Sequence, residues 1–200
     1  LSMATIQKDN ISHYEVSNLF WINAIVGLIL MIIVISVAPL IGAFYGEPSI
    51  VPVTIALSSV FLFGGLSIQH QAILRRKMEF LSLAFISFSS TFLALVTALV
   101  SAWAGLGFWS LALQQISQSL YMMVGTWILC NWRPSLLKFS INIRSLISFG
   151  ADISFYNVLN YFIRNSDKIL IGKFLSPASL GLYERSYQLF LVPVSRLLPL

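Results

Sequence analysis

The feature that most constrains this chain is a series of apolar segments, each long enough to cross a lipid bilayer. The strongest runs from Leu19 to Phe44 and contains no charged residue. A bilayer requires about 20 mostly apolar residues per helical span, because only a helix pairs its own backbone N–H and C=O groups in lipid. Four segments meet this length clearly: 19–44, 50–72, 80–102 and 107–130. The sequence therefore predicts an all-α, polytopic transmembrane helical bundle.

The composition supports a membrane protein over a soluble domain. Hydrophobic residues make up 58% of the chain and charged residues only 10%, and the mean hydropathy is +0.85. A soluble domain is roughly half apolar and about a quarter charged. With so few charges, the excess apolar surface must face lipid or other helices.

The basic residues orient the predicted spans. The formal net charge is +5, but the cations lie between apolar segments and form no single basic face, so we expect no nucleic-acid partner. Six cations follow the second and fourth segments: Arg75, Arg76, Lys77, Arg133, Lys138 and Arg144. The connections around Glu47 and Gly105 carry no Lys or Arg. Basic loops stay on the cytoplasmic side of the membrane. The loops after the second and fourth segments, which carry these six cations, are therefore predicted to be cytoplasmic.

Residues 1–132 are expected to form part of an amino-terminal lobe with four spans. Residues 133–146 are predicted to be a cytoplasmic amphipathic linker lying along the inner membrane surface. Residues 147–200 would begin a second lobe, with spans at about 147–175 and 180–200. The chain begins without Met and ends inside an apolar segment, so we expect both ends to continue in a longer protein.

The predicted fifth span carries a stripe of polar and charged residues at intervals of three and four, which places them on one helix face. The stripe consists of Asn157, Asn160, Arg164, Asp167 and Lys168. Ionisable groups inside a span cost at least ~2.5 kcal/mol each at mid-helix, so they normally face a bundle interior or a wet cavity. The stripe is therefore predicted to point inward.

Two interpretations of this stripe remain open. Arg164 and Asp167 are close enough to pair, which would leave Lys168 as a surplus cation suited to a phosphate or pyrophosphate group, with Arg164 providing a bidentate fork. Alternatively, Arg164 and Asp167 form a structural pair between helices, while Lys168 extends toward the membrane interface.

The predicted fourth span carries a weaker stripe of Gln114, Gln118 and Tyr121. These side chains could contact sugar hydroxyls, but hydrogen bonding between helices is the commoner role of glutamine in membranes. His13 and His70 have no second ligand at metal spacing, so no metal site is predicted. No phosphate-binding loop or hydrolase motif is present, so the sequence predicts neither a cofactor nor an enzyme.

Several motifs along the whole chain resemble one known family. They are Phe44-Tyr45-Gly46-Glu47-Pro48, the loop from Gln71 to Phe80, the stretch from Gly105 to Leu111, and the segment from Asn160 to Leu175 with its continuation Leu180-Gly181-Leu182-Tyr183. Together they resemble the polysaccharide flippases of the multidrug/oligosaccharidyl-lipid/polysaccharide exporter superfamily. The most similar branch includes the colanic acid and teichuronic acid exporters.

The resemblance implies a two-lobe, multi-pass transporter of the bacterial inner membrane. By alternating access it would move an undecaprenyl-diphosphate-linked oligosaccharide outward, in contact with membrane lipid and with the polysaccharide polymerase machinery as a partner. The family's cationic cavity would correspond to Arg164 and Lys168, and Asp167 would be the candidate for ion coupling. The alternatives are a multidrug antiporter of the same superfamily, a membrane polysaccharide polymerase or ligase, and a noncatalytic scaffold.

Overall fold

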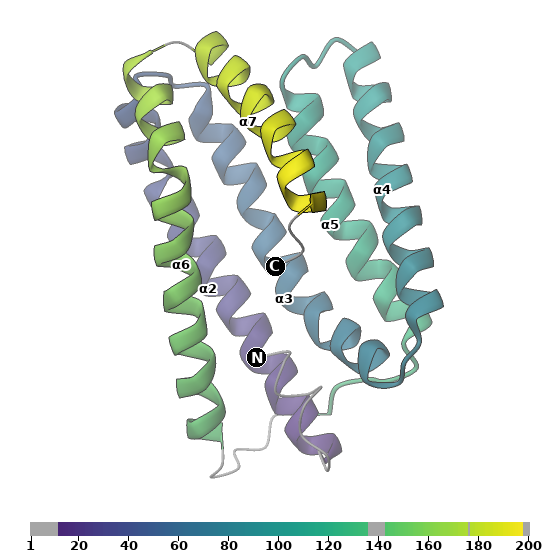
Figure 1. Ribbon diagram of the computed structural model, residues 1–200. Helices are drawn as coiled ribbons and strands as arrows, with labels where there is room; N and C mark the ends of the chain where they lie inside the picture. The colour runs from purple at the N-terminus through teal and green to yellow at the C-terminus, as the bar shows by residue number, and fades with distance from the viewer. Residues whose placement is uncertain (1–11, 136–142, 176, 198–200) are drawn as a thin grey trace. The chain divides into compact units, whose positions relative to one another are not determined.

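The computed structural model describes residues 12–135, 143–175 and 177–197, and within these ranges the chain consists of helices joined by short connections (Figure 1). The helices are α2 (His13–Tyr45), α3 (Ile50–Arg76), α4 (Phe80–Trp103), α5 (Trp109–Leu129), α6 (Ile143–Phe174) and α7 (Pro177–Leu197). The prediction of an all-α fold is confirmed.

Three helices, α2, α3 and α4, are long and apolar enough to cross a membrane. They correspond to the predicted spans 19–44, 50–72 and 80–102. Helix α5 has 21 residues and is not among these three helices of the described part of the chain. Membrane crossing by 107–130, 147–175 and 180–200 stays a prediction.

Local sequence explains where the helices begin and turn. Ser12 and Glu15 form a capping box at the start of α2, in which each backbone N–H donates to the other residue's side chain, at 2.9 Å and 3.3 Å. Between α4 and α5, Gly105 and Gly107 have φ angles of +80° and +54°, which glycine adopts without steric cost. This tight turn lets α4 and α5 pack against each other as an antiparallel pair (Figure 1).

The chain divides into two compact units. One comprises Leu1–Ala43 and Glu47–Phe149, and the other comprises Phe44–Gly46 and Gly150–Leu200. The division lies close to residue 147, where the sequence predicts a second lobe, although the assignment of these units to transporter lobes stays a prediction. Helix α6 begins at Ile143, inside the predicted linker 133–146. Residues 136–142 of that linker lie outside the described residues.

Glycine allows α2 and α3 to approach each other closely in the first unit. A Cβ atom added to Gly65 would lie 2.6 Å from the carbonyl oxygen of Asn23, and one added to Gly27 would lie 2.6 Å from that of Phe61. Real Cβ atoms do not come so close to a backbone oxygen, so both positions require glycine. Such small residues are typical of contacts between membrane helices.

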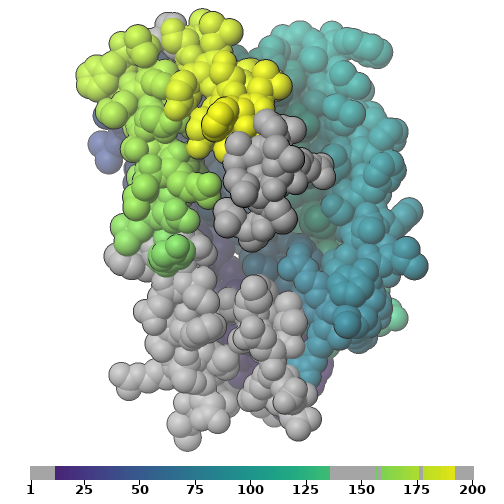
Figure 2. All heavy atoms as spheres, viewed as in Figure 1, coloured from purple at the N-terminus to yellow at the C-terminus, as the bar shows by residue number. Residues whose placement is uncertain are grey.

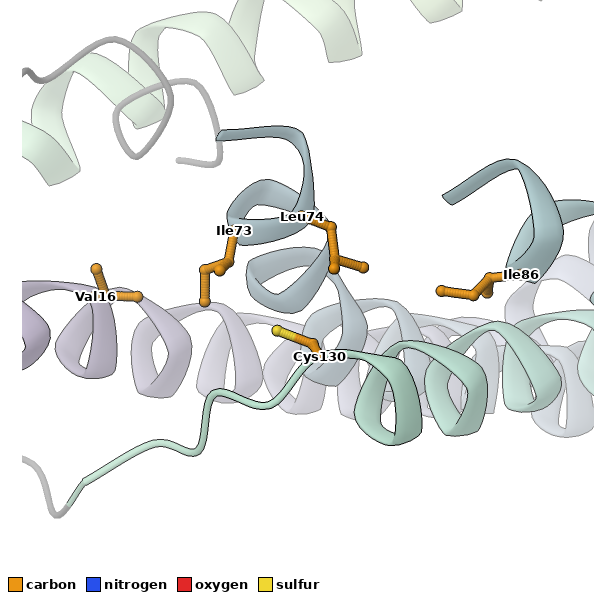
Figure 3. Packing of buried hydrophobic residues seen from close by; sticks show 5 residues of the cluster. All are labelled: Val16, Ile73, Leu74, Ile86 and Cys130. Carbon is orange, nitrogen blue, oxygen red and sulfur yellow. The ribbon is translucent and has the colours of Figure 1, made fainter. Parts of the chain in front are cut away.

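One buried apolar cluster lies in the first unit. It contains Val16, Ile73, Leu74, Ile86 and Cys130 (Figure 3). By contrast, many large apolar side chains of α4 are exposed. The blue-green spheres in Figure 2 show the surface of this part of the chain. This distribution matches a bundle whose outer surface is covered by lipid instead of water.

An aromatic cluster joins α2, α3, the end of α5 and the segment that follows α5. It consists of Phe20, His70, Trp127 and Trp132, and the His70 ring centroid lies 4.6 Å from that of Trp127 and 5.3 Å from that of Trp132. His70 is fully buried. The Trp127 Nε1–H donates to the carbonyl of Leu66 at 3.1 Å. The sequence pattern around His70 did not indicate this packing role.

Candidate functional site

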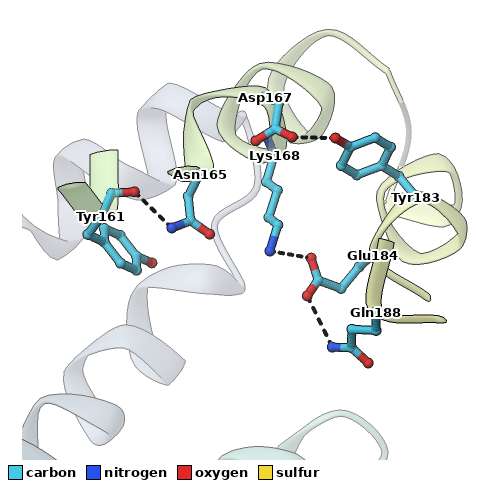
Figure 4. Close-up of polar contacts among 7 residues, drawn as sticks. All are labelled: Tyr161, Asn165, Asp167, Lys168, Tyr183, Glu184 and Gln188. Atoms are coloured by element: carbon cyan, nitrogen blue, oxygen red, sulfur yellow. Dashed lines mark hydrogen bonds and ion pairs between the residues drawn. The ribbon is translucent and has the colours of Figure 1, made fainter. Parts of the chain in front are cut away.

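Helices α6 and α7 of the second unit meet through two polar contacts between neighbouring residues (Figure 4). The ammonium Nζ of Lys168 lies 2.7 Å from Oε2 of Glu184, and the Tyr183 hydroxyl donates to Oδ2 of Asp167. We call these four side chains the α6–α7 clasp. The clasp forms because Asp167 and Lys168 lie near the end of α6 and their partners lie near the start of α7.

Further contacts hold the acidic members of the clasp. The Gln188 side-chain amide donates to Oε1 of Glu184 at 3.1 Å, one turn along the same helix. Oδ1 of Asp167 accepts the backbone N–H of Lys168 at 2.9 Å. Each carboxylate therefore has a separate partner for each of its two oxygens.

Lys168 is held electrostatically and is still partly accessible. Its ammonium lies 5.4 Å from the centroid of the Tyr187 ring, within the range of a cation–π interaction. The side chains of Lys168 and Glu184 are 23% and 36% exposed. An external anion can therefore reach this ion pair without unfolding either helix.

Arg164 lies one turn before Lys168 on the predicted stripe, and its side chain is exposed. Within the described residues it forms no ion pair. The expected contact between Arg164 and Asp167 is not made, because Asp167 contacts Tyr183 and the Lys168 backbone instead. The surplus cation of the stripe is consequently Arg164 and not Lys168, whose charge is balanced by Glu184.

Of the two asparagines in the stripe, the structure describes the side chain of Asn160 alone. Asn160 is half-buried on α6, whereas the side chain of Asn157 lies outside the described residues. Asn165, which the sequence did not single out as a binding residue, donates to the carbonyl of Tyr161 on its own helix at 2.8 Å. Substrate binding by Asn157 and Asn160, and ion coupling by Asp167, stay predictions.

The stripe on α5 contacts the neighbouring helix α4. The Gln118 side-chain amide donates to Oγ1 of Thr91 at 3.3 Å, and the Tyr121 hydroxyl lies 3.5 Å from Oγ1 of Thr97. Gln114 is half-buried. These contacts favour the interhelical role over sugar binding for Gln118 and Tyr121. Sugar contact by the three residues stays a prediction.

The sequence missed the part of the site on α7. Tyr183 and Glu184 lie in the first turns of the predicted sixth span, and their sequence positions fit either an interfacial anchor or a site. The available signal was the turn near Ser176 and Pro177: in a helical hairpin, residues at similar distances before and after the turn face each other. Lys168 and Glu184 satisfy that relation.

Sequence comparison gives this geometry a family context. A family described as "Polysaccharide biosynthesis protein" matches residues 1–199. The chain belongs to this family. The resemblance found from the motifs is therefore confirmed at the level of this family.

Three curated relatives match nearly the whole chain. The teichuronic acid biosynthesis protein TuaB of Bacillus subtilis (strain 168) is 27% identical over 98% of this chain and 41% of its own length. The lipopolysaccharide biosynthesis protein WzxC of Escherichia coli (strain K12) is 25% identical over 100% of this chain and 41% of its own. The amylovoran biosynthesis protein AmsL of Erwinia amylovora is 23% identical over 100% of this chain and 52% of its own. The chain thus spans about half the length of these relatives or less, and no solved structure matches it.

Proposed function

We propose that the full-length protein moves an undecaprenyl-diphosphate-linked oligosaccharide across the bacterial inner membrane for the synthesis of surface polysaccharide. The single observation that carries this proposal is Arg164, an exposed cation on α6 whose charge no described residue balances. Arg164 precedes the α6–α7 clasp on α6. In the clasp, Asp167 and Lys168, the other charged residues of the stripe, both have partners.

The chemistry of a lipid-linked sugar fits such a cation. Its diphosphate is the charged group that hydrocarbon excludes, and a guanidinium can bind two phosphate oxygens at once. A charged side chain in a span is expensive and is typically associated with a substrate or ion pathway. Arg164 would hold the diphosphate while it crosses the membrane, and Lys168 would extend the positive face.

The relatives' names support recognition through the diphosphate more than through the sugars. They refer to teichuronic acid, lipopolysaccharide and amylovoran, which are different products. A site built from charges suits a lipid diphosphate shared by such precursors while the sugars vary. On this proposal the protein is a transporter without bond-forming chemistry, and it delivers its substrate to the polysaccharide polymerase machinery.

Reconstitution of the purified full-length protein into vesicles tests the proposal. The vesicles would contain undecaprenyl diphosphate carrying a fluorescent oligosaccharide, and a membrane-impermeant quencher would report which leaflet holds the sugar. We expect faster movement between leaflets with the wild type and a loss of that movement with Arg164→Ala. New glycosidic bonds without movement between leaflets would instead identify a polymerase or ligase and overturn the proposal.

A further inference from the structure

We infer that Glu184 competes with the substrate for Lys168. Glu184 pairs with Lys168 when no substrate is bound, and the diphosphate of the lipid-linked sugar displaces it. This inference rests on the proposed function, since it assigns a role to the ion pair beside Arg164. It identifies Glu184 as a positioning residue that sets the affinity of the site.

The contact that Glu184 makes is one that a phosphate oxygen can also make. Its carboxylate oxygen lies 2.7 Å from the Lys168 ammonium, the distance of a charge-assisted hydrogen bond to any oxyanion. The lysine ammonium is a compact charge and lacks the planar, bidentate geometry of the arginine guanidinium. It can therefore bind a phosphate oxygen in place of a carboxylate oxygen without changing its own geometry. Lys168 is therefore the exchangeable cation of the site.

Glu184 keeps hydrogen-bond partners when it leaves Lys168. Its other oxygen already accepts the Gln188 amide at 3.1 Å from the same helix, and its side chain is 36% exposed. The released carboxylate is consequently not buried without a partner, which would be costly. Partly exposed ion pairs of this kind are weak, so a doubly anchored diphosphate can compete with them.

The second contact of the clasp stays in place during this exchange. Tyr183 donates to Asp167, and neither group attracts an anion, because one is a neutral donor already in use and the other is negative. This contact keeps α6 and α7 together while Lys168 changes partner. Arg164 precedes Lys168 by four residues, which places the two Cβ atoms about 5–6 Å apart on one helix face. A single diphosphate can therefore contact both cations.

Binding measurements on the full-length protein test the inference. The probes are undecaprenyl diphosphate in nanodiscs and inorganic pyrophosphate at low salt, which separate a requirement for the lipid from recognition of the phosphates alone. We expect Glu184→Gln to increase the affinity for undecaprenyl diphosphate at least threefold, because the competing charge is gone. Glu184→Asp, whose shorter side chain reaches Lys168 less well, should give a smaller increase.

A double-mutant cycle separates local competition from general electrostatics. In a Lys168→Gln background, Glu184→Gln should no longer increase the affinity, since its contact is absent. The matched control is Glu47→Gln, which removes one exposed acid of the first unit and should leave the affinity unchanged. An equal increase with the control, or in the Lys168→Gln background, would contradict the inference.

Different experimental results would refute this inference and the proposed function. If Lys168→Gln and Arg164→Ala weaken binding but Glu184→Gln does not strengthen it, Glu184 is only a structural partner and the anion site stands. If neither cation variant changes binding of either probe, the anion site itself is refuted. Thermal unfolding of every variant shows whether a change in affinity comes from a folded protein.

Discussion

The two units of this protein hold their helices together with different chemistry. In the first unit, α2 and α3 touch at Gly27 and Gly65, and α4 and α5 share neutral hydrogen bonds such as that from Gln118 to Thr91. In the second unit, α6 and α7 are joined by an ion pair and a carboxylate–tyrosine contact. Neutral, closely packed contacts give a fixed arrangement, whereas partly exposed charged contacts can be exchanged for those of a charged ligand. We propose that the first unit provides packing and that the second unit provides binding.

The largest effect is expected from exchanging the charges of the ion pair in the second unit. Lys168→Glu alone places two carboxylates opposite each other and should reduce both protein level and surface polymer. Combining it with Glu184→Lys restores the pair, so the protein level should recover. Polymer should stay low, because the cation has moved from α6 to α7. Quantitative immunoblotting and polymer staining measure the two quantities, and full recovery of polymer would show that the pair is only structural.

A smaller loss is expected from crowding the helix contact of the first unit. Gly65→Ala forces a methyl group against the Asn23 carbonyl, and such overpacking typically costs about 1–3 kcal/mol. The adjacent Gly64 has no atom within 4 Å of a built Cβ, so Gly64→Ala should stabilise the helix by about 0.5–1 kcal/mol. Thermal unfolding of the purified variants measures the difference. Similar values for both would mean that α2 and α3 do not cross at Gly65.

The smallest effect is expected from the neutral stripe on α5. Gln118→Leu removes the hydrogen bond to Thr91 and should lower the free energy of unfolding by about 0.6 kcal/mol, the average for such bonds in membrane proteins. Polymer production should stay at the wild-type level, because the residue acts in packing. A strong loss of polymer at normal protein level would instead support sugar binding by this stripe and remove the contrast between the units.

The sequence predicted the parts of this structure that depend on local pattern. Apolar length identified α2, α3 and α4. Glycine at positions 105 and 107 permits the tight turn, and Gly65 permits the close helix contact, so both features have a local cause in the sequence. Helical spacing also placed Arg164 and Lys168 on one face. These features follow from periodicity and backbone preference, which a single sequence displays directly.

The sequence did not predict which residues are partners across helices. Spacing along α6 made Arg164 the nearest partner for Asp167, but the α6–α7 hairpin brings Tyr183 to the same carboxylate. His70 likewise becomes a core residue only because Phe20 and Trp127 arrive from other helices. Such choices depend on competition among several contacts in three dimensions, and intervals along the chain do not encode that competition.

The most direct test of the account is the replacement of Arg164 in the full-length protein, with surface polymer measured against the amount of protein in the membrane. Arg164→Ala should abolish polymer at a normal protein level, and Arg164→Lys should restore it only in part, since lysine keeps the charge but lacks the bidentate fork. Arg185→Ala, which removes an exposed cation of α7, is the matched control and should produce normal polymer. Normal polymer in both Arg164 variants would contradict the account. It would show that the stripe on α6 has only a structural role.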